Sequence, residues 1–279
     1  MRSAVRAFLE SRYARLVTPL LLVILTAAFF WILLQAPFWI AFVPCVIVGH
    51  RIGILLHEFM HGIPFRRYRD NLNVVTFVDG LMLLFGMLEV FRGTHLEHHR
   101  WLNTGRDPAR ESDARTRAQH RIASAFELFQ YLVYLADTLA GRKPYIRGRR
   151  ILCSAAISTV AILGWVWAGH AEVVWKVMAI SVFTTLVPVS LRGAVEHYNH
   201  PGAPGATNEY RVWIPLFNLN RHLHHHEDST VPWYLLEFKT GKPLPNWHYF
   251  THWFRVYITH DYELMRPLKH RVEGREEQA

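Results

Sequence analysis

Histidine is unusually abundant in this chain and is grouped in four clusters. The 279 residues contain 18 histidines, against 22 aspartates and glutamates combined. Imidazole is the commonest metal ligand in proteins, and residues three or four apart share one face of a helix. The clusters are 57–61 (HEFMH), 95–99 (HLEHH), 196–200 (EHYNH) and 222–226 (HLHHH). Each can present two or three imidazoles in one direction, so the sequence predicts a metal site.

Apolar segments long enough to cross a membrane must position these clusters. A spanning helix needs about 20 apolar residues to cross the hydrocarbon core of roughly 30 Å. Spans are predicted at about 16–34, 38–56, 151–171 and 173–191. Short links join the first to the second and the third to the fourth, which predicts two antiparallel hairpins. A fifth apolar stretch, 72–88, contains Asp79 and Gly80, and we expect it to lie on the membrane or to be partly inserted.

The distribution of arginine and lysine predicts the orientation of the spans. Four arginines precede the first span and many more lie in the loop 92–150, whereas the two opposite turns have almost none. By the positive-inside tendency, both termini and the regions 92–150 and 197–279 are cytosolic. All four histidine clusters then lie on the cytosolic side, although the argument made no use of histidine. The sequence therefore predicts a single all-α, multi-pass membrane domain over residues 1–279 with one metal site.

Composition excludes several other classes of protein. Disorder is excluded for most of the chain, because 51% of its residues are hydrophobic and only 19% are charged. Cys45 and Cys153 are too few for a disulfide framework or for a cysteine-ligated zinc or iron–sulfur site. The net charge of +9 could suggest nucleic acid. The basic residues flank apolar segments, as juxtamembrane charge does, so we expect no nucleic-acid partner.

The identity of the metal has two interpretations. Residues 57–61 match the HExxH signature of zinc proteases, in which Glu58 would be the general base. Zinc needs three protein ligands and a water, and that interpretation leaves the other three clusters unused. Eight or nine imidazoles suit two iron ions better. Two irons are the favoured interpretation, and a zinc-dependent membrane protease is the weaker alternative.

The spacing of the histidines resembles that of the membrane fatty acid desaturase and hydroxylase superfamily. The pattern is HxxxH, HxxHH and HxxHH on the cytosolic ends of four helices, and the resemblance extends from about residue 16 to residue 254. RDP at 106–108 and NLNRH at 218–222 add to it. It implies a cytosolic helical cap that holds two irons (Fe2+/Fe3+). Carried over position by position, it implies these iron ligands: His57, His61, His95, His98, His99, His197, His222, His225 and His226.

Two further histidines are alternatives within this set. His200 competes with His197, and His224 fills a position where the pattern needs no histidine. Carboxylates also accompany every cluster, and a ligating imidazole usually donates its other N–H to such a group, which fixes its orientation. We expect this outer role for Glu58, Glu97, Asp107, Glu196 and Glu227, the alternative being that they are solvated charges beside a basic surface. No catalytic residue beyond the metal ligands is assigned.

The chemistry that the resemblance implies is O2-dependent oxidation of an unactivated C–H bond in a lipid. We expect an oxidoreductase, with desaturation of an acyl lipid, acyl-CoA or acyl-carrier-protein substrate favoured over hydroxylation or ketolation of a lipid or carotenoid. The sequence shows no dinucleotide fingerprint, cysteine cluster or haem domain, which predicts a separate ferredoxin or cytochrome b5-type donor with its reductase. The arginine-rich stretch 100–121 is a candidate docking surface for an acidic carrier, unless it serves lipid headgroups.

Overall fold

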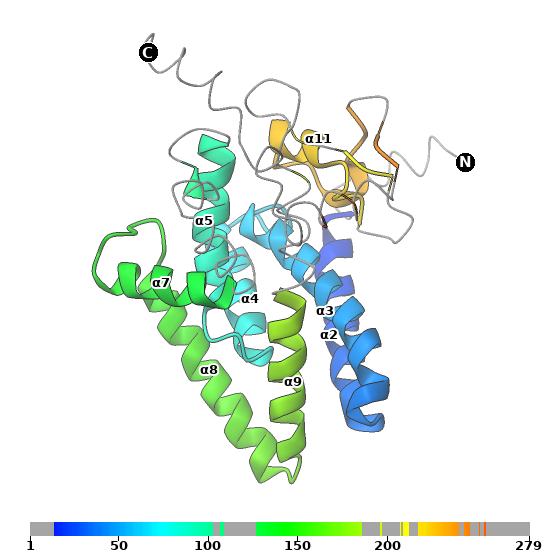
Figure 1. Ribbon diagram of the computed structural model, residues 1–279, viewed down its shortest axis with the longest axis vertical. Coiled ribbons are helices and arrows are strands. Elements are labelled where there is room, and N and C mark those ends of the chain that lie inside the picture. The colour runs from blue at the N-terminus through cyan, green and yellow to red at the C-terminus, as the bar shows by residue number, and fades with distance from the viewer. Residues whose placement is uncertain are drawn as a thin grey trace.

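The protein is seen in a computed structural model. The residues that it describes are 14–102, 107–108, 127–185, 196, 207, 209–211, 217–239, 243–245, 251 and 254. Within them the chain is helical and no strand is assigned, and Tyr210 and Leu244 form an isolated bridge. The long helices form a bundle, and α11 lies at the end of the molecule opposite the α8–α9 turn (Figure 1). The prediction of an all-α fold is therefore confirmed.

Two long helices form the first predicted hairpin. A short 3-10 turn, η1 (Ala14–Leu16), leads into α2 (Val17–Gln35), and α3 (Phe38–Met60) follows. Ala36, which precedes Pro37, has extended backbone with φ −118° and ψ 146°. Residues before proline are driven out of the helical region by steric clash, which ends α2 at this point. Because α3 continues to residue 60 rather than 56, the first histidine cluster begins on its last turn.

The second hairpin consists of α8 (Gly148–Trp167) and α9 (Ala171–Thr184). Gly169 between them has φ 80°, a left-handed conformation that glycine adopts without the steric cost of a Cβ atom. By length and composition, α2, α3 and α8 are able to cross a membrane. The predicted fourth span ends at 191, and residues 186–191 lie outside the described residues, so that span stays a prediction.

The apolar stretch 72–88 belongs to a helix pair. α4 (Tyr68–Leu81) packs against α8, and α5 (Met87–Trp101) rises from the lower end of α4 towards the level of α11 (Figure 1). Asp79 holds the link between them, because its carboxylate accepts backbone hydrogen bonds from Gly86 at 2.7 Å and Leu88 at 2.6 Å. These two bonds satisfy N–H groups at the start of α5. α7 (Glu127–Leu139) precedes α8 and contacts α5.

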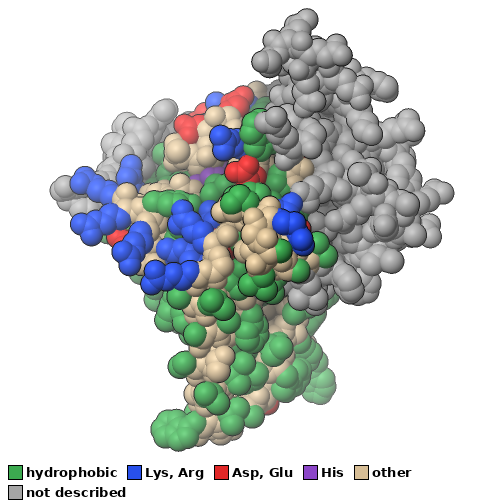
Figure 2. Space-filling view, turned by 90° about the vertical axis from the view of Figure 1, so that its left-hand side faces the viewer, with side chains coloured by type: hydrophobic (Ala, Val, Ile, Leu, Met, Phe, Trp, Pro, Cys, Tyr) green, Lys and Arg blue, Asp and Glu red, His purple; other side chains and the backbone are tan. Residues whose placement is uncertain are grey.

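The bundle has an apolar core and an apolar outer surface. Leu33, Leu55 and Ile180 are among the buried side chains contributed by α2, α3 and α9. Large apolar side chains such as Trp39 and Trp167, 72% and 90% exposed, face outwards. On the face shown in Figure 2, apolar side chains predominate over the narrow lower part, and lysines and arginines gather above them. An apolar surface of this extent is stable when lipid covers it, so the structure is that of a membrane protein.

Candidate metal centre

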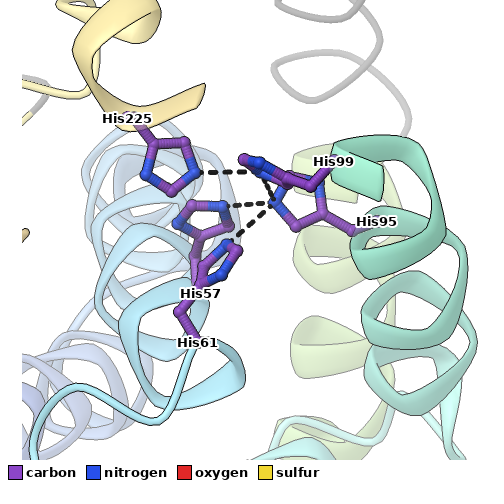
Figure 3. A group of neighbouring side chains, drawn as sticks. All are labelled: His57, His61, His95, His99 and His225. Atoms are coloured by element: carbon purple, nitrogen blue, oxygen red, sulfur yellow. Dashed lines mark hydrogen bonds between the residues drawn. The ribbon is translucent and has the colours of Figure 1, made fainter. Parts of the chain in front are cut away.

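Five imidazoles from three separate helices converge at one place (Figure 3). His57 lies on the last turn of α3 and His61 at its C-terminal cap. His95 and His99 lie one turn apart on α5, and His225 lies on α11 (His222–Glu227). One ligand atom from each of the five lies within 4.8 Å of all the others. The i, i+4 spacing read from the sequence therefore directs both helical pairs towards a common centre.

The ring nitrogens of this cluster face one another. His57 Nε2 lies 2.6 Å from His95 Nε2, and His61 Nε2 and His99 Nε2 lie 3.2 Å and 3.0 Å from the same atom. His225 Nε2 lies 3.1 Å from His99 Nε2. A ring nitrogen carries either one proton or one lone pair, so His95 Nε2 cannot hydrogen-bond well to three neighbours at once. Lone pairs directed at a shared point fit a metal ion, and an imidazole donor set suits iron.

Burial favours the metal-binding form of three of these imidazoles. It lowers the pKa of His61 to about 4. It also lowers the pKa of His95 and His99, and neighbouring imidazoles lower both further because like charges repel. The rings of His61, His95 and His99 are therefore neutral near pH 7, and neutral imidazole has the lone pair that a metal requires.

Three more predicted ligands adjoin the five-histidine cluster. The ring of His226 stacks on His99 with centroids 4.0 Å apart, and the centroid of His98 lies 5.3 Å from that of His226. His222 Nε2 lies 3.1 Å from His226 Nε2. The predicted ligands that the structure describes thus form one continuous group carried by α3, α5 and α11.

Three histidine candidates remain. His197 and His200 are outside the described residues, so their roles stay predictions. His224 Nδ1 accepts a 3.0 Å hydrogen bond from the backbone N–H of Glu237 at an exposed position. The ring of His224 therefore contacts the segment that follows η4 (Trp233–Leu235), on a different side of α11 from its neighbour His225.

Comparison with known proteins agrees with this geometry. The sequence model of the family described as fatty acid desaturase matches residues 37–255. The chain belongs to the fatty acid desaturase family. It is therefore an oxidoreductase of an iron-dependent family whose members carry out lipid oxidation of the desaturase or hydroxylase type, and its histidine cluster is the candidate metal site. Neither curated proteins nor solved structures yield a match to the chain.

Two of the predicted carboxylates in this desaturase-family protein contact a candidate ligand. Asp107 lies with its carboxylate oxygens 2.8 Å and 3.0 Å from His98 Nδ1. Asp107 accepts a hydrogen bond from Nδ1–H of His98, so the lone pair of His98 lies on Nε2, where it can bind a metal. This is the contact expected of an outer carboxylate. Glu196 contacts His222 instead through Nε2, with its Oε2 at 3.5 Å. Both carboxylates are buried.

Two other predicted carboxylates pair with groups outside the histidine cluster. Glu97 accepts a 3.0 Å hydrogen bond from Trp101 Nε1. The carboxylate of Glu227 is about half exposed and lies 3.6 Å from Lys239 Nζ. These contacts are those of ordinary charged or polar surface groups, in line with the alternative considered from the sequence.

Glu58 ties three segments together. Its Oε2 accepts a 2.7 Å hydrogen bond from the hydroxyl of Thr18, and its Oε1 accepts one from the backbone N–H of Trp233. Trp233 Nε1 also donates to Thr18 Oγ1 at 3.3 Å. Sequence reasoning missed Thr18 and Trp233, since neither is near a histidine in the sequence. With both oxygens accepting structural hydrogen bonds, Glu58 is poorly placed to act as the base of a zinc protease.

A small apolar cavity adjoins the cluster. It touches His57 and His225, and Ile54, Leu219 and Leu236 contribute to its walls. Its volume is about 10 Å³, close to the minimum needed by one water-sized molecule. The cavity gives a small apolar molecule room beside the imidazoles, but an acyl chain needs far more space.

Proposed function

We propose that the protein is an O2-dependent di-iron enzyme that oxidises an unactivated C–H bond of a lipid, with fatty acyl desaturation as the favoured reaction. The observation that carries the proposal is the convergence of imidazoles from α3, α5 and α11 in a chain of the fatty acid desaturase family. Two bound irons would supply the activation of O2 that removal of such a hydrogen requires. The imidazoles of the cluster would hold the metal and exclude water around it.

The apolar surface supports a lipid substrate. Exposed apolar side chains on α2, α3 and α8 let a hydrophobic chain approach through the bilayer. An acyl lipid, acyl-CoA or acyl-carrier-protein substrate satisfies this condition. A hydroxylase or ketolase would share the first hydrogen abstraction with a desaturase, and the product separates the two.

The proposal also includes the membrane topology of the chain and its electron donor. The chain is a single membrane domain with four spans, and both termini and the iron site lie on the cytosolic side. Electrons come from a separate ferredoxin or cytochrome b5-type protein with its reductase. The stretch 100–121 that would receive this donor is described only at 100–102 and 107–108.

The test combines lipid profiling with metal analysis. Cells that express the wild type should accumulate lipids with new double bonds, seen by mass spectrometry, whereas His95→Ala cells should not. His170→Ala is the matched control, because His170 is a histidine at the N-terminal cap of α9 in the opposite turn, and it should retain activity. Purified protein should contain two irons per chain. New hydroxyl or keto groups would identify a hydroxylase or ketolase, and a single zinc with peptide cleavage would overturn the proposal.

A further inference from the structure

Arginines gather where α4 and α8 begin, and the beginnings of these two helices adjoin. The guanidinium of Arg147 lies over the ring of Tyr68, 5.9 Å from its centroid. Further along, the guanidinium of Arg150 donates to Thr76 Oγ1 at 2.9 Å, so α4 and α8 lie side by side and run in the same direction. The arginine patch, as we name it, consists of the six arginines at the two beginnings: Arg66, Arg67, Arg69, Arg147, Arg149 and Arg150.

The arginine patch is a strongly positive surface. Five of its six side chains are exposed, and Arg150 is half-buried. In the first turns of α4 and α8 the one acidic residue is Asp70. Neighbouring positive charges repel one another, and an anion that lies among them relieves the repulsion. Guanidinium groups bind the oxygens of a phosphate through paired, charge-assisted hydrogen bonds. The chemistry that fits this surface is therefore a phosphate group.

On α4 the exposed face changes from basic to apolar along the helix. Arg69, Asn73 and Phe77 are each four residues apart, so they share one face, and all three are exposed. The side chain of Phe77 is 53% exposed. Tyr68, 37% exposed, lies at the basic end, and tyrosine is enriched where a membrane meets water. This face therefore offers a polar end and an apolar end to one molecule.

The outer face of α8 changes in the same way. Arg149 is exposed, and Leu152 follows it three residues later with 69% of its side chain exposed. Val160, eight residues after Leu152 and 70% exposed, continues the same face. On the face shown in Figure 2, lysines and arginines likewise lie directly above apolar side chains. A molecule with a phosphate at one end and hydrocarbon at the other matches both helices.

We propose that the arginine patch binds the headgroup phosphate of an anionic phospholipid, whose acyl chains lie along the exposed apolar faces of α4 and α8. An acidic protein would complement the arginines, but it would leave the adjoining apolar side chains uncovered, and a phospholipid covers both. None of the six arginines belongs to the five-histidine cluster, so the inference does not depend on the proposed function.

The test counts bound lipid by native mass spectrometry. The full-length protein, purified in detergent, is titrated with phosphatidylglycerol or with phosphatidylcholine that has the same acyl chains. The wild type should bind phosphatidylglycerol more tightly, because phosphatidylcholine has no net charge. Arg67→Gln/Arg149→Gln should weaken phosphatidylglycerol binding by roughly 10- to 30-fold and leave phosphatidylcholine binding as in the wild type.

A matched pair separates the arginine patch from net charge. Arg142→Gln/Arg211→Gln also removes two exposed arginines, one of which is already paired with Asp137 at 2.6 Å. This variant should bind phosphatidylglycerol within about twofold of the wild type. Equal weakening in both double variants overturns the proposal, as does a wild type that binds the two lipids equally.

Two further measurements distinguish the lipid from other anions. Glycerol phosphate has the phosphate without the acyl chains, and at concentrations equal to that of the lipid it should displace little of it. Full displacement would identify a site for free phosphate and overturn the proposal. So would an acidic electron carrier that binds Arg67→Gln/Arg149→Gln less tightly while lipid binding is unchanged.

Gel filtration and far-ultraviolet circular dichroism check that each variant folds. Should the double variant fold poorly, Arg149→Gln alone should weaken phosphatidylglycerol binding by roughly 3- to 5-fold. Wild-type binding in folded Arg149→Gln would then overturn the proposal.

Discussion

The hydroxyl of Thr18 donates a 2.7 Å hydrogen bond to the carboxylate of Glu58 and thereby joins the first turn of α2 to the last turn of α3. The backbone N–H of Trp233 donates to the other oxygen of the same carboxylate. The segment after α11 is thus attached to the helix that carries His57. The hydrogen bonds of Glu58 thereby help to hold the last histidine cluster, 222–226, next to the first, 57–61.

Replacement of Glu58 by alanine tests this link. The change leaves the buried hydroxyl of Thr18 and the N–H of Trp233 without their acceptor, and it should lower the free energy of unfolding by roughly 2–5 kcal/mol. Denaturant unfolding in detergent measures the loss. Glu237→Ala, at an exposed position on the same segment, is the control and should change stability by less than about 0.5 kcal/mol. A Glu58→Ala protein as stable as the wild type would contradict the role of the carboxylate as a structural acceptor.

Two adjacent histidines on α11 should respond differently to substitution. His225 belongs to the metal cluster, so His225→Ala should reduce the iron content and abolish product formation. His224 contacts the backbone of Glu237, so His224→Ala should keep the iron content and most of the activity. Iron analysis of the two purified proteins makes the comparison. Equal iron loss in both would show that the metal binds a different set of the histidines in 222–226.

Local spacing was the part of the site that the sequence could predict. His57 with His61, and His95 with His99, are each four residues apart, and helical geometry alone places both members of each pair on one face. The meeting of these helices depends on packing between distant segments. For that reason the sequence could name Asp107 and Glu196 as carboxylates near histidines, but it could not show which ring nitrogen each of them faces.

The boundaries of the helices show a second limit of sequence patterns. Hydropathy marks where a chain is apolar, whereas a helix ends where its backbone hydrogen bonds end. α8 accordingly begins at Gly148, before the apolar run, and its first turn includes Arg150. The guanidinium of Arg150 donates a 2.9 Å hydrogen bond to Thr76 Oγ1 of α4, so a charged residue is accommodated inside the helix. This tertiary contact with α4 could not be read from the hydropathy of α8.

Asp79 should stabilise α5, the helix that carries the second histidine cluster. Its carboxylate accepts hydrogen bonds from Gly86, Leu88 and the hydroxyl of Ser154. Asp79→Ala should lower the free energy of unfolding by about 1.5–3 kcal/mol for each bond that water does not replace, because bonds to a charged acceptor are the stronger ones. Ser154→Ala, which removes one donor and leaves the two backbone bonds, should cost about 1.5–3 kcal/mol, less than Asp79→Ala. Thermal unfolding of the two variants should rank them in this order, and the reverse order would contradict the assignment.

The contact between α4 and α8 at Gly80 should not tolerate a larger side chain. A Cβ atom at this position would lie 2.5 Å from Cβ and Cγ2 of Ile157 and 3.1 Å from the backbone oxygen of Ser154. The backbone of α8 would have to move, so Gly80→Ala should destabilise the protein by about 1–3 kcal/mol. Gly164→Ala on α8 is the matched control, because a Cβ there meets nothing within 4 Å and alanine favours a helix by roughly 0.5–1 kcal/mol. Melting temperatures should therefore fall for Gly80→Ala and stay level or rise for Gly164→Ala. A rise for both would mean that α4 and α8 are not in contact at Gly80.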